Sequence, residues 1–200
     1  MRVIGPATAL VVLLACAARS AVSPLNDAVG AVRDTLAKAR AVVLTDDSHE
    51  QKVAALHELA RHLMDTREMG RKAIGPRLDE QPAAKQEEFF NLFDELIVRS
   101  YLQKLLFFRQ PRFAFGQEET AKDTVIVHTR ILTEKDEFFV NYEMHQRDGT
   151  WVASDVVVEN ISLAQNYAQQ FQELLRSRSF DDLLELMRGK VAGLRAKAAS

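Results

Sequence analysis

The sequence predicts an α+β fold in which a helical layer packs on an antiparallel sheet of about four strands, as a single domain. Apolar residues recur at the helical period up to about residue 110, at the two-residue period of strands to about residue 158, and at the helical period again afterwards. The 200 residues are 47% hydrophobic and 27% charged, which is enough apolar material for one buried core. No internal repeat or linker divides the chain.

The first residues predict a secretory signal peptide over residues 1–21. Arg2 precedes an apolar run from Ala7 to Ala18, and small residues that suit cleavage follow it. The run is shorter than the roughly 20 apolar residues that cross a bilayer. We therefore expect an exported, soluble mature domain over residues 22–200, with cleavage between residues 18 and 22.

Cys16 is the single cysteine, and it lies where a lipoprotein signal would place its acylated thiol. Leu14 fits the lipoprotein motif poorly, however, and the apolar run continues past the cysteine. We expect no lipid anchor at Cys16 and a mature chain with no thiol, disulfide or cysteine-based metal site.

Helices are expected on both sides of the strands, and typical N-terminal residues mark their starts. The four expected early helices begin at Ser23-Pro24, Ser48, Asp65 and Pro82, and the two late ones begin at Ser162 and Ser179. The third helix ends at Gly75-Pro76, and the fourth ends before Pro111. The fourth helix has the widest apolar surface, which is formed by Phe89, Phe90, Phe93, Leu96, Ile97, Tyr101, Leu105, Phe107 and Phe108.

Four runs with alternating apolar residues predict the strands. They contain Phe113 and Phe115; Val125, Val127 and Ile131; Phe138, Val140, Tyr142 and Met144; and Trp151 to Val158. Short polar connections separate them, and the last connection contains Asp148-Gly149, which favours a tight hairpin. The expected sheet is an antiparallel meander.

Charge and motifs exclude several classes of function. A net charge of −2 and a pI near 6.2 argue against nucleic acid as a partner, because such binding requires clustered Lys and Arg. The sequence has no glycine-rich phosphate loop, no nucleophile elbow and no metal-ligand set, so we expect no catalytic residue, cofactor or metal. His57 and His62 are five residues apart and cannot share a metal from one helix face, so both are expected on the helix surface.

The segment from Trp151 to Leu163, followed by Asn166-Tyr167 and Gln170-Phe171, resembles the signature of the MlaC family, also called toluene-tolerance or ABC-transporter auxiliary proteins. Asn160 departs from this signature, since the family often has glycine there. The resemblance extends over most of the mature chain and includes the exported N-terminus, the aromatic helix and the strands.

This resemblance implies a periplasmic phospholipid carrier with a curved, nuclear-transport-factor-like sheet and acyl chains between the sheet and the helical layer. It also implies two partners, an outer-membrane lipoprotein complex and an inner-membrane ABC transporter with an MCE-type ring protein. A hopanoid-associated branch resembles the family too, so a polycyclic lipid remains an alternative cargo. Such a carrier needs an apolar container, because one acyl chain of about 16 carbons exposes on the order of 12 kcal/mol to water.

On this interpretation two sets of residues are expected to line the lipid site. The inward face of the sheet supplies Val125, Val127, Ile131, Phe138, Val140, Tyr142 and Met144, with Trp151 in the pocket wall. The facing helix supplies Phe93, Ile97 and Tyr101.

Two rival functions stay open at this point. Tyr142 and Asp155 would be the acid and base of an enzyme if they converged, although Asp155 is expected to be a structural hydrogen-bond acceptor. A periplasmic adaptor with a filled core and no ligand is the other rival. Arg176 and Arg178 are expected on a solvated helix face rather than against a lipid phosphate.

Overall fold

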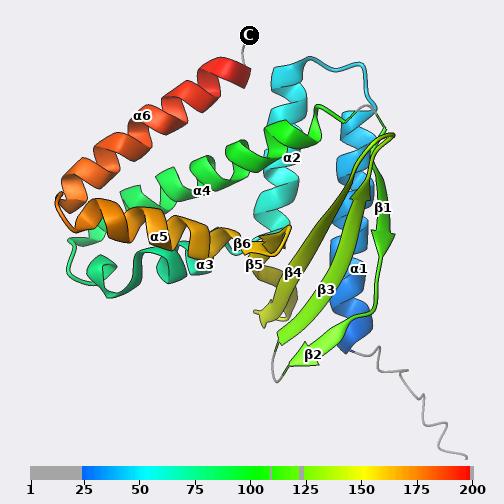
Figure 1. The fold of residues 1–200 in the computed structure, drawn as a ribbon, viewed down its shortest axis with the longest axis horizontal. Coiled ribbons are helices and arrows are strands. Elements are labelled where there is room, and N and C mark those ends of the chain that lie inside the picture. The colour runs from blue at the N-terminus through cyan, green and yellow to red at the C-terminus, as the bar shows by residue number, and fades with distance from the viewer. Residues whose placement is uncertain (1–23, 109, 122–123, 199–200) are drawn as a thin grey trace, which may run out of the picture.

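A computed structural model describes residues 24–108, 110–121 and 124–198 (Figure 1). The predicted signal peptide and Cys16 lie outside the described residues. The helices are α1 (Pro24–Val43), α2 (His49–Leu63), α3 (Thr66–Ile74), the short 3-10 helix η1 (Gly75–Leu78), α4 (Ala83–Leu105), α5 (Leu163–Leu175) and α6 (Phe180–Ala198). The predicted α+β fold with one domain is confirmed, and among the described helices none is both long and apolar enough to cross a bilayer.

The sheet is antiparallel and contains the four predicted strands together with two short additions. The strands are β1 (Arg112–Phe115), β2 (Glu119–Ala121), β3 (Thr124–Leu132), β4 (Glu137–Arg147), β5 (Thr150–Val158) and β6 (Ile161–Ser162). Their order is β1-β3-β4-β5-β6, and β2 pairs with the other end of β3. The predicted Asp148-Gly149 turn joins β4 to β5, and both of its residues have positive φ angles.

Local capping explains where several helices start. Ser48 accepts a hydrogen bond from the backbone N–H of Gln51, whose side chain accepts one from the Ser48 N–H. Ser179 and Asp182 make the same reciprocal pair before α6. The Asp65 carboxylate accepts from the Glu68 N–H at the start of α3. These predicted helix starts are confirmed.

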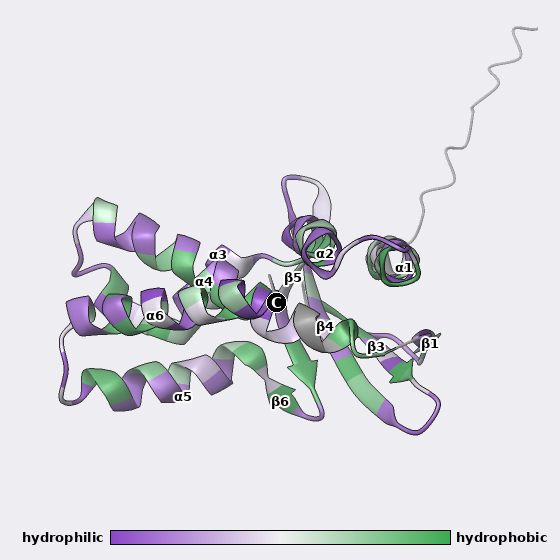
Figure 2. Cartoon of the chain, turned by 90° about the horizontal axis from the view of Figure 1, so that it is seen from above, coloured by the Kyte–Doolittle hydropathy of each residue, from purple (hydrophilic) through white to green (hydrophobic). Residues whose placement is uncertain are grey.

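The helices divide into two groups around the sheet (Figures 1 and 2). Helices α1 and α2 pack together, and α1 crosses β3, β4 and β5 on one face of the sheet, which we call the inner face. Helices α3 to α6 form a helical layer beside the β5–β6 edge, where α3 and α5 pack on β5 and α4 packs on α3 and α6. One continuous apolar core therefore has two parts, one between α1 and the inner face and one within the helical layer.

The helical layer has an aromatic centre. The ring of Phe93 lies 5.7 Å from Phe89, 5.5 Å from Tyr167 and 6.1 Å from Phe171, measured between centroids. Phe180, at the start of α6, adds a further ring 6.0 Å from Phe89. These edge-on and stacked contacts add to the free energy of burial and fix the helices relative to one another.

A buried carboxylate joins the sheet to the helical layer. Asp155 accepts hydrogen bonds from the backbone N–H of Val156 at 2.8 Å, from the N–H of Ala164 at 3.2 Å, and from the Ser162 hydroxyl. Ser162 in turn caps α5 by accepting from the Gln165 N–H. The predicted structural role of Asp155 is confirmed, because all of these donors belong to the turn from β5 into α5.

Candidate functional site

The residues predicted for the inward side of the sheet all lie on the inner face. Strands β3 and β4 are paired so that their inner-face residues form successive rows. The rows are Val125 with Met144, Val127 with Tyr142, Thr129 with Val140, and Ile131 with Phe138. Strand β5 extends these rows with Val158, Val156, Ala153 and Trp151. The inner face is therefore a continuous apolar surface that runs the length of the sheet.

Helix α1 covers this surface with small and branched aliphatic residues. The buried residues of the helix that belong to the same core cluster as the sheet are Ala28, Val29, Val32 and Leu36, whereas Ala39 and Val43 pack with Leu56 of α2. No part of the site was predicted on this helix. Its apolar stripe was visible in the sequence, but nothing in the spacing said which helix would lie on the sheet.

The inner face is closed in this structure. Val127 and Met144 have 0% of their surface exposed, so no space large enough for a water molecule adjoins either side chain. The side chains of the sheet and of α1 fill the interface between them. An acyl chain could enter only if the covering helices moved away from the sheet.

Polar groups are few on the inner face. The Thr129 hydroxyl donates to the Val140 carbonyl at 2.7 Å and is thereby satisfied. Burial raises the pKa of Tyr142, so its phenol stays neutral. The indole N–H of Trp151 is buried and has no acceptor within the protein. The face thus contains no charged group, which suits an apolar ligand.

Both ends of the inner face are less buried than its middle. At one end Ile131 and Phe138 are half-buried, and the Phe138 ring stacks on Phe108 at 5.4 Å. Phe107, next in the connection from α4 to β1, is 80% exposed. At the other end, beside the β4–β5 hairpin, Trp151 is half-buried. These ends are the places where the interior meets solvent.

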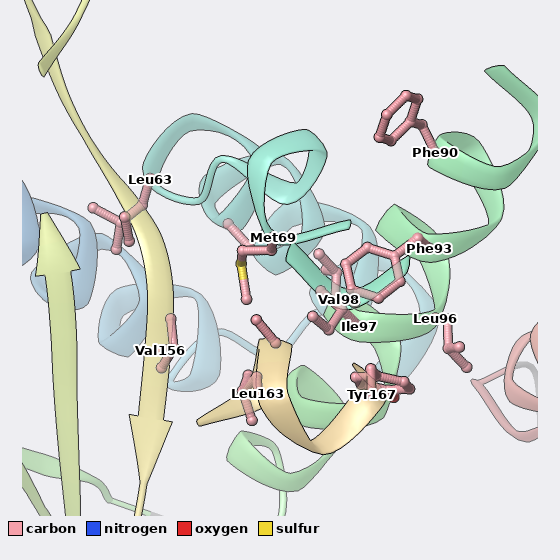
Figure 3. Close-up of a cluster of buried hydrophobic side chains, with 14 of the residues drawn as sticks. Leu63, Met69, Phe90, Phe93, Leu96, Ile97, Val98, Val156, Leu163 and Tyr167 are labelled. Atoms are coloured by element: carbon pink, nitrogen blue, oxygen red, sulfur yellow. The ribbon is translucent and has the colours of Figure 1, made fainter. Parts of the chain in front are cut away.

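The residues predicted on the facing helix, α4, lie in the helical layer rather than on the inner face. Figure 3 shows Met69 of α3 and Leu163 of α5 between Val156 of β5 and the α4 side chains. Phe93 and Ile97 have 0% exposure. The hydroxyl of Tyr101 is hydrogen-bonded to Asn166 of α5. The two sets of predicted site residues thus belong to one core but lie in different parts of it, with α3 and α5 between them.

Two surface hollows lie near α4, and both are polar. One has a volume of about 190 Å³ and is lined by residues that include Arg61, Asp65, Arg67, Asp94 and Arg147. The second, of about 530 Å³, adjoins it, and its lining includes the α4 carboxylates Glu87, Glu88, Asp94 and Glu95 together with Arg61 and Arg195. Arg147 pairs with Asp65 at 2.7 Å and Arg67 pairs with Glu87 at 2.7 Å. Neither hollow suits an acyl chain, because paired charges line both.

His57 was predicted on the helix surface, and this prediction is wrong. The residue is 8% exposed, and its Nε2 lies 3.5 Å from the Asp94 carboxylate. Burial raises the pKa of Asp94, but the nearby His57, the hydrogen bond from Thr66 and the charge of Arg61 outweigh this effect, so its pKa lies below the ordinary value. This group joins α2 to α4.

The other polar candidates do not form a reactive group. Tyr142 and Asp155 sit on opposite-parity positions of the β4–β5 pairing, and the Asp155 oxygens are occupied by the β5–α5 turn. Arg176 and Arg178 are exposed, as expected, and Arg176 pairs with Glu173 at 2.7 Å. Within residues 24–108, 110–121 and 124–198, no three His, Cys, Asp or Glu side chains are placed to hold a metal.

Comparison with known proteins gives a family and a fold. The sequence matches the family model of the MlaC protein over residues 30–189. A phospholipid-binding protein from Ralstonia solanacearum, solved in complex with a phospholipid, has a similar structure with a TM-score of 0.77. The two sequences are 20% identical, and the match covers 84% of this chain and 98% of that one. No curated protein matches this sequence.

Proposed function

The chain belongs to the MlaC family, and we propose that it binds phospholipid and carries it between membranes without catalysing a reaction. The main support for this proposal is that the inner face is a continuous apolar surface with no charged group. The family and the phospholipid-bound structure of similar fold support the choice of ligand.

The dimensions of the inner face suit an acyl chain. The distance along β4 from the row of Trp151 to the row of Phe138 is about 27 Å, at about 3.4 Å per residue. One leaflet of a bilayer core, which is the depth that one chain fills, is about 15 Å thick. A chain could therefore lie wholly along the inner face, with its head group at an end where the interior meets solvent.

Loading requires the closed interface to open. The contacts between α1 and the sheet are aliphatic, and they involve small side chains such as Ala28 and Val32. Replacing these contacts by contacts with an acyl chain exchanges one apolar neighbour for another, so the free-energy difference is small. On this view the acyl chain takes the place of helix side chains on Val127 and Met144.

The location and partners form part of the same proposal. The predicted signal peptide would export the chain to the periplasm, where a carrier would cross the aqueous space between the two membranes. We propose an outer-membrane lipoprotein complex and an inner-membrane ABC transporter with an MCE-type ring protein as the sites of loading and delivery. Mass spectrometry of the exported protein tests the location, and a new N-terminus within residues 18–22 is the expected result.

The direct test is lipid analysis of the protein expressed from residue 22 and purified without detergent. We expect native mass spectrometry to show a bound species that solvent extraction identifies as phospholipid. The delipidated protein should also take phospholipid from vesicles. A matched control is the Phe139→Ala variant, whose exposed side chain lies on the opposite face of β4.

Three other outcomes would contradict the proposal. A protein that is stable, carries no lipid and takes none from vesicles would favour an adaptor with a filled core. A bound hopanoid in place of phospholipid would show that the protein carries a polycyclic lipid instead. Turnover of a small substrate that is lost in Asp155→Asn while lipid binding persists would indicate an enzyme.

A further inference from the structure

One donor on the inner face has no partner. The indole nitrogen of Trp151 is buried and makes no hydrogen bond within the protein. A buried donor left without an acceptor costs about 1–3 kcal/mol, so such groups are normally satisfied by a ligand or water. Indole can only donate, so the group that completes this site has to be an acceptor.

The position of Trp151 is the boundary between solvent and the dry interior. Its neighbour across the β4–β5 pair, Gln146, is exposed, whereas the next row, Met144 with Ala153, has no exposed surface. Beyond that row the inner face is apolar up to Phe138. A ligand that is apolar along most of its length and carries an acceptor at one end would match this order of groups.

A glycerophospholipid has this pattern, because ester carbonyls stand where its acyl chains begin. We propose that the Trp151 indole N–H donates a hydrogen bond to an ester carbonyl of the bound lipid. This bond fixes how far the lipid enters and selects ester-linked over ether-linked lipid. The inference rests on the proposed function, since it names the contact that a lipid on the inner face would make.

The experiment compares ester-linked and ether-linked phosphatidylcholine of equal chain length. Delipidated wild-type protein and the Trp151→Phe variant are each equilibrated with vesicles that contain both lipids, and the bound ratio is measured by mass spectrometry. We expect the wild type to prefer the ester lipid by about threefold to tenfold, the value of one net hydrogen bond. The preference should vanish in Trp151→Phe, which keeps an aromatic ring but has no donor.

Fluorescence gives a second measurement that needs no substitution. Trp151 is the single tryptophan of the chain, so all indole emission reports on this position. Phosphatidylcholine with bromine atoms near the ester end of its chains should quench this emission more strongly than lipid with bromine near the methyl ends. Equal quenching, or stronger quenching by the methyl-end label, would overturn the inference.

The outcomes separate this inference from the proposed function. If the wild type binds both lipids equally, or if Trp151→Phe keeps the ester preference, the contact is refuted while lipid binding stands. If neither lipid binds to the wild type, the proposed function fails and the inference fails with it.

Discussion

The helical layer and the inner face of the sheet are both apolar interfaces, but they are built differently. In the helical layer, large rings contact one another at centroid distances of 5.5 to 6.1 Å, as Phe93 does with Tyr167 and Phe171. On the inner face, aliphatic residues of α1 meet Val, Met and Tyr residues of the sheet. Interlocked rings resist separation, whereas aliphatic surfaces can exchange one apolar neighbour for another.

Ion pairs also distinguish the helical layer from the inner face. Arginines of α3 and α6 pair with carboxylates of α4, at 2.7 Å for Arg67 with Glu87 and 2.6 Å for Arg188 with Glu88. The arginines of α1 make other contacts on the strand side, since Arg40 donates to the Pro111 carbonyl at 3.0 Å and the Arg33 guanidinium lies 4.9 Å from the centre of the Phe115 ring. Exposed pairs add little to stability individually, but they do specify which helices meet. The difference suggests a firm helical layer beside an interface that can open.

The largest expected effect is on the helical layer. Phe93→Ala removes the ring at the centre of the aromatic group and should lower the free energy of unfolding by about 3–5 kcal/mol, measured by urea denaturation. Lipid bound per folded molecule should not change, because Phe93 lies away from the inner face. A folded variant that has lost lipid binding would instead place acyl chains in the helical layer.

Substitution of Asp155 tests the connection between the sheet and the helical layer. Asp155→Ala leaves the Val156 and Ala164 N–H groups without an acceptor and should lower the free energy of unfolding by about 2–3 kcal/mol. Ser162→Ala, which removes the cap of α5, should cost about 1 kcal/mol. Equal losses for the two variants would mean that the buried carboxylate adds nothing beyond the cap.

The role of the inner face in lipid binding can be tested with a larger side chain on β3. Val127→Phe adds volume between the sheet and α1, and we expect a stability loss of about 1–3 kcal/mol from overpacking. Phospholipid uptake from vesicles should fall as well, because the added ring occupies the place of an acyl chain. The matched control is Ile126→Phe, one residue earlier on the opposite face of β3, which should take up lipid normally. Unchanged uptake by Val127→Phe would exclude this part of the face from the site.

The smallest expected effect is a pH dependence at the junction of α2 with α4. Asp94 has a lowered pKa in the folded protein, so its stabilising contribution is complete above its unfolded pKa of about 3.8 and is lost as the pH falls through the folded value. Asp94→Asn should flatten this part of the stability curve, measured by denaturation at a series of acidic pH values. A curve identical to that of the wild type would show that other carboxylates dominate.

Local signals in the sequence predicted much of the fold. Helix starts such as Ser48 and Ser179 depend on hydrogen bonds to residues three positions away, so neighbouring sequence determines them. The composition of the inner face followed from the two-residue period, since residues of one parity share a face. The short strands β2 and β6 left no pattern, because two or three residues are too few to show a period.

Contacts between distant segments could not be predicted in the same way. The stripe of α1 and the stripe of α4 both indicate an apolar face, but which of them covers the sheet depends on packing across many residues. The burial of His57 could not be predicted, because its partner Asp94 is far along the chain. The sequence also could not predict that the Trp151 indole N–H lacks an acceptor, since this depends on the groups that surround it in the folded protein.

The pairing of α6 with α4 has a consequence for the order of folding. Arg188 and Arg195 contact Glu88 and Glu95, each across 100 residues of sequence. Closing a loop costs entropy that grows slowly with loop length, and topologies rich in distant contacts fold slowly. The native tertiary structure can form only after the last helix has been synthesised. A chain that acquires its final shape so late would remain incompletely folded for longer during its synthesis.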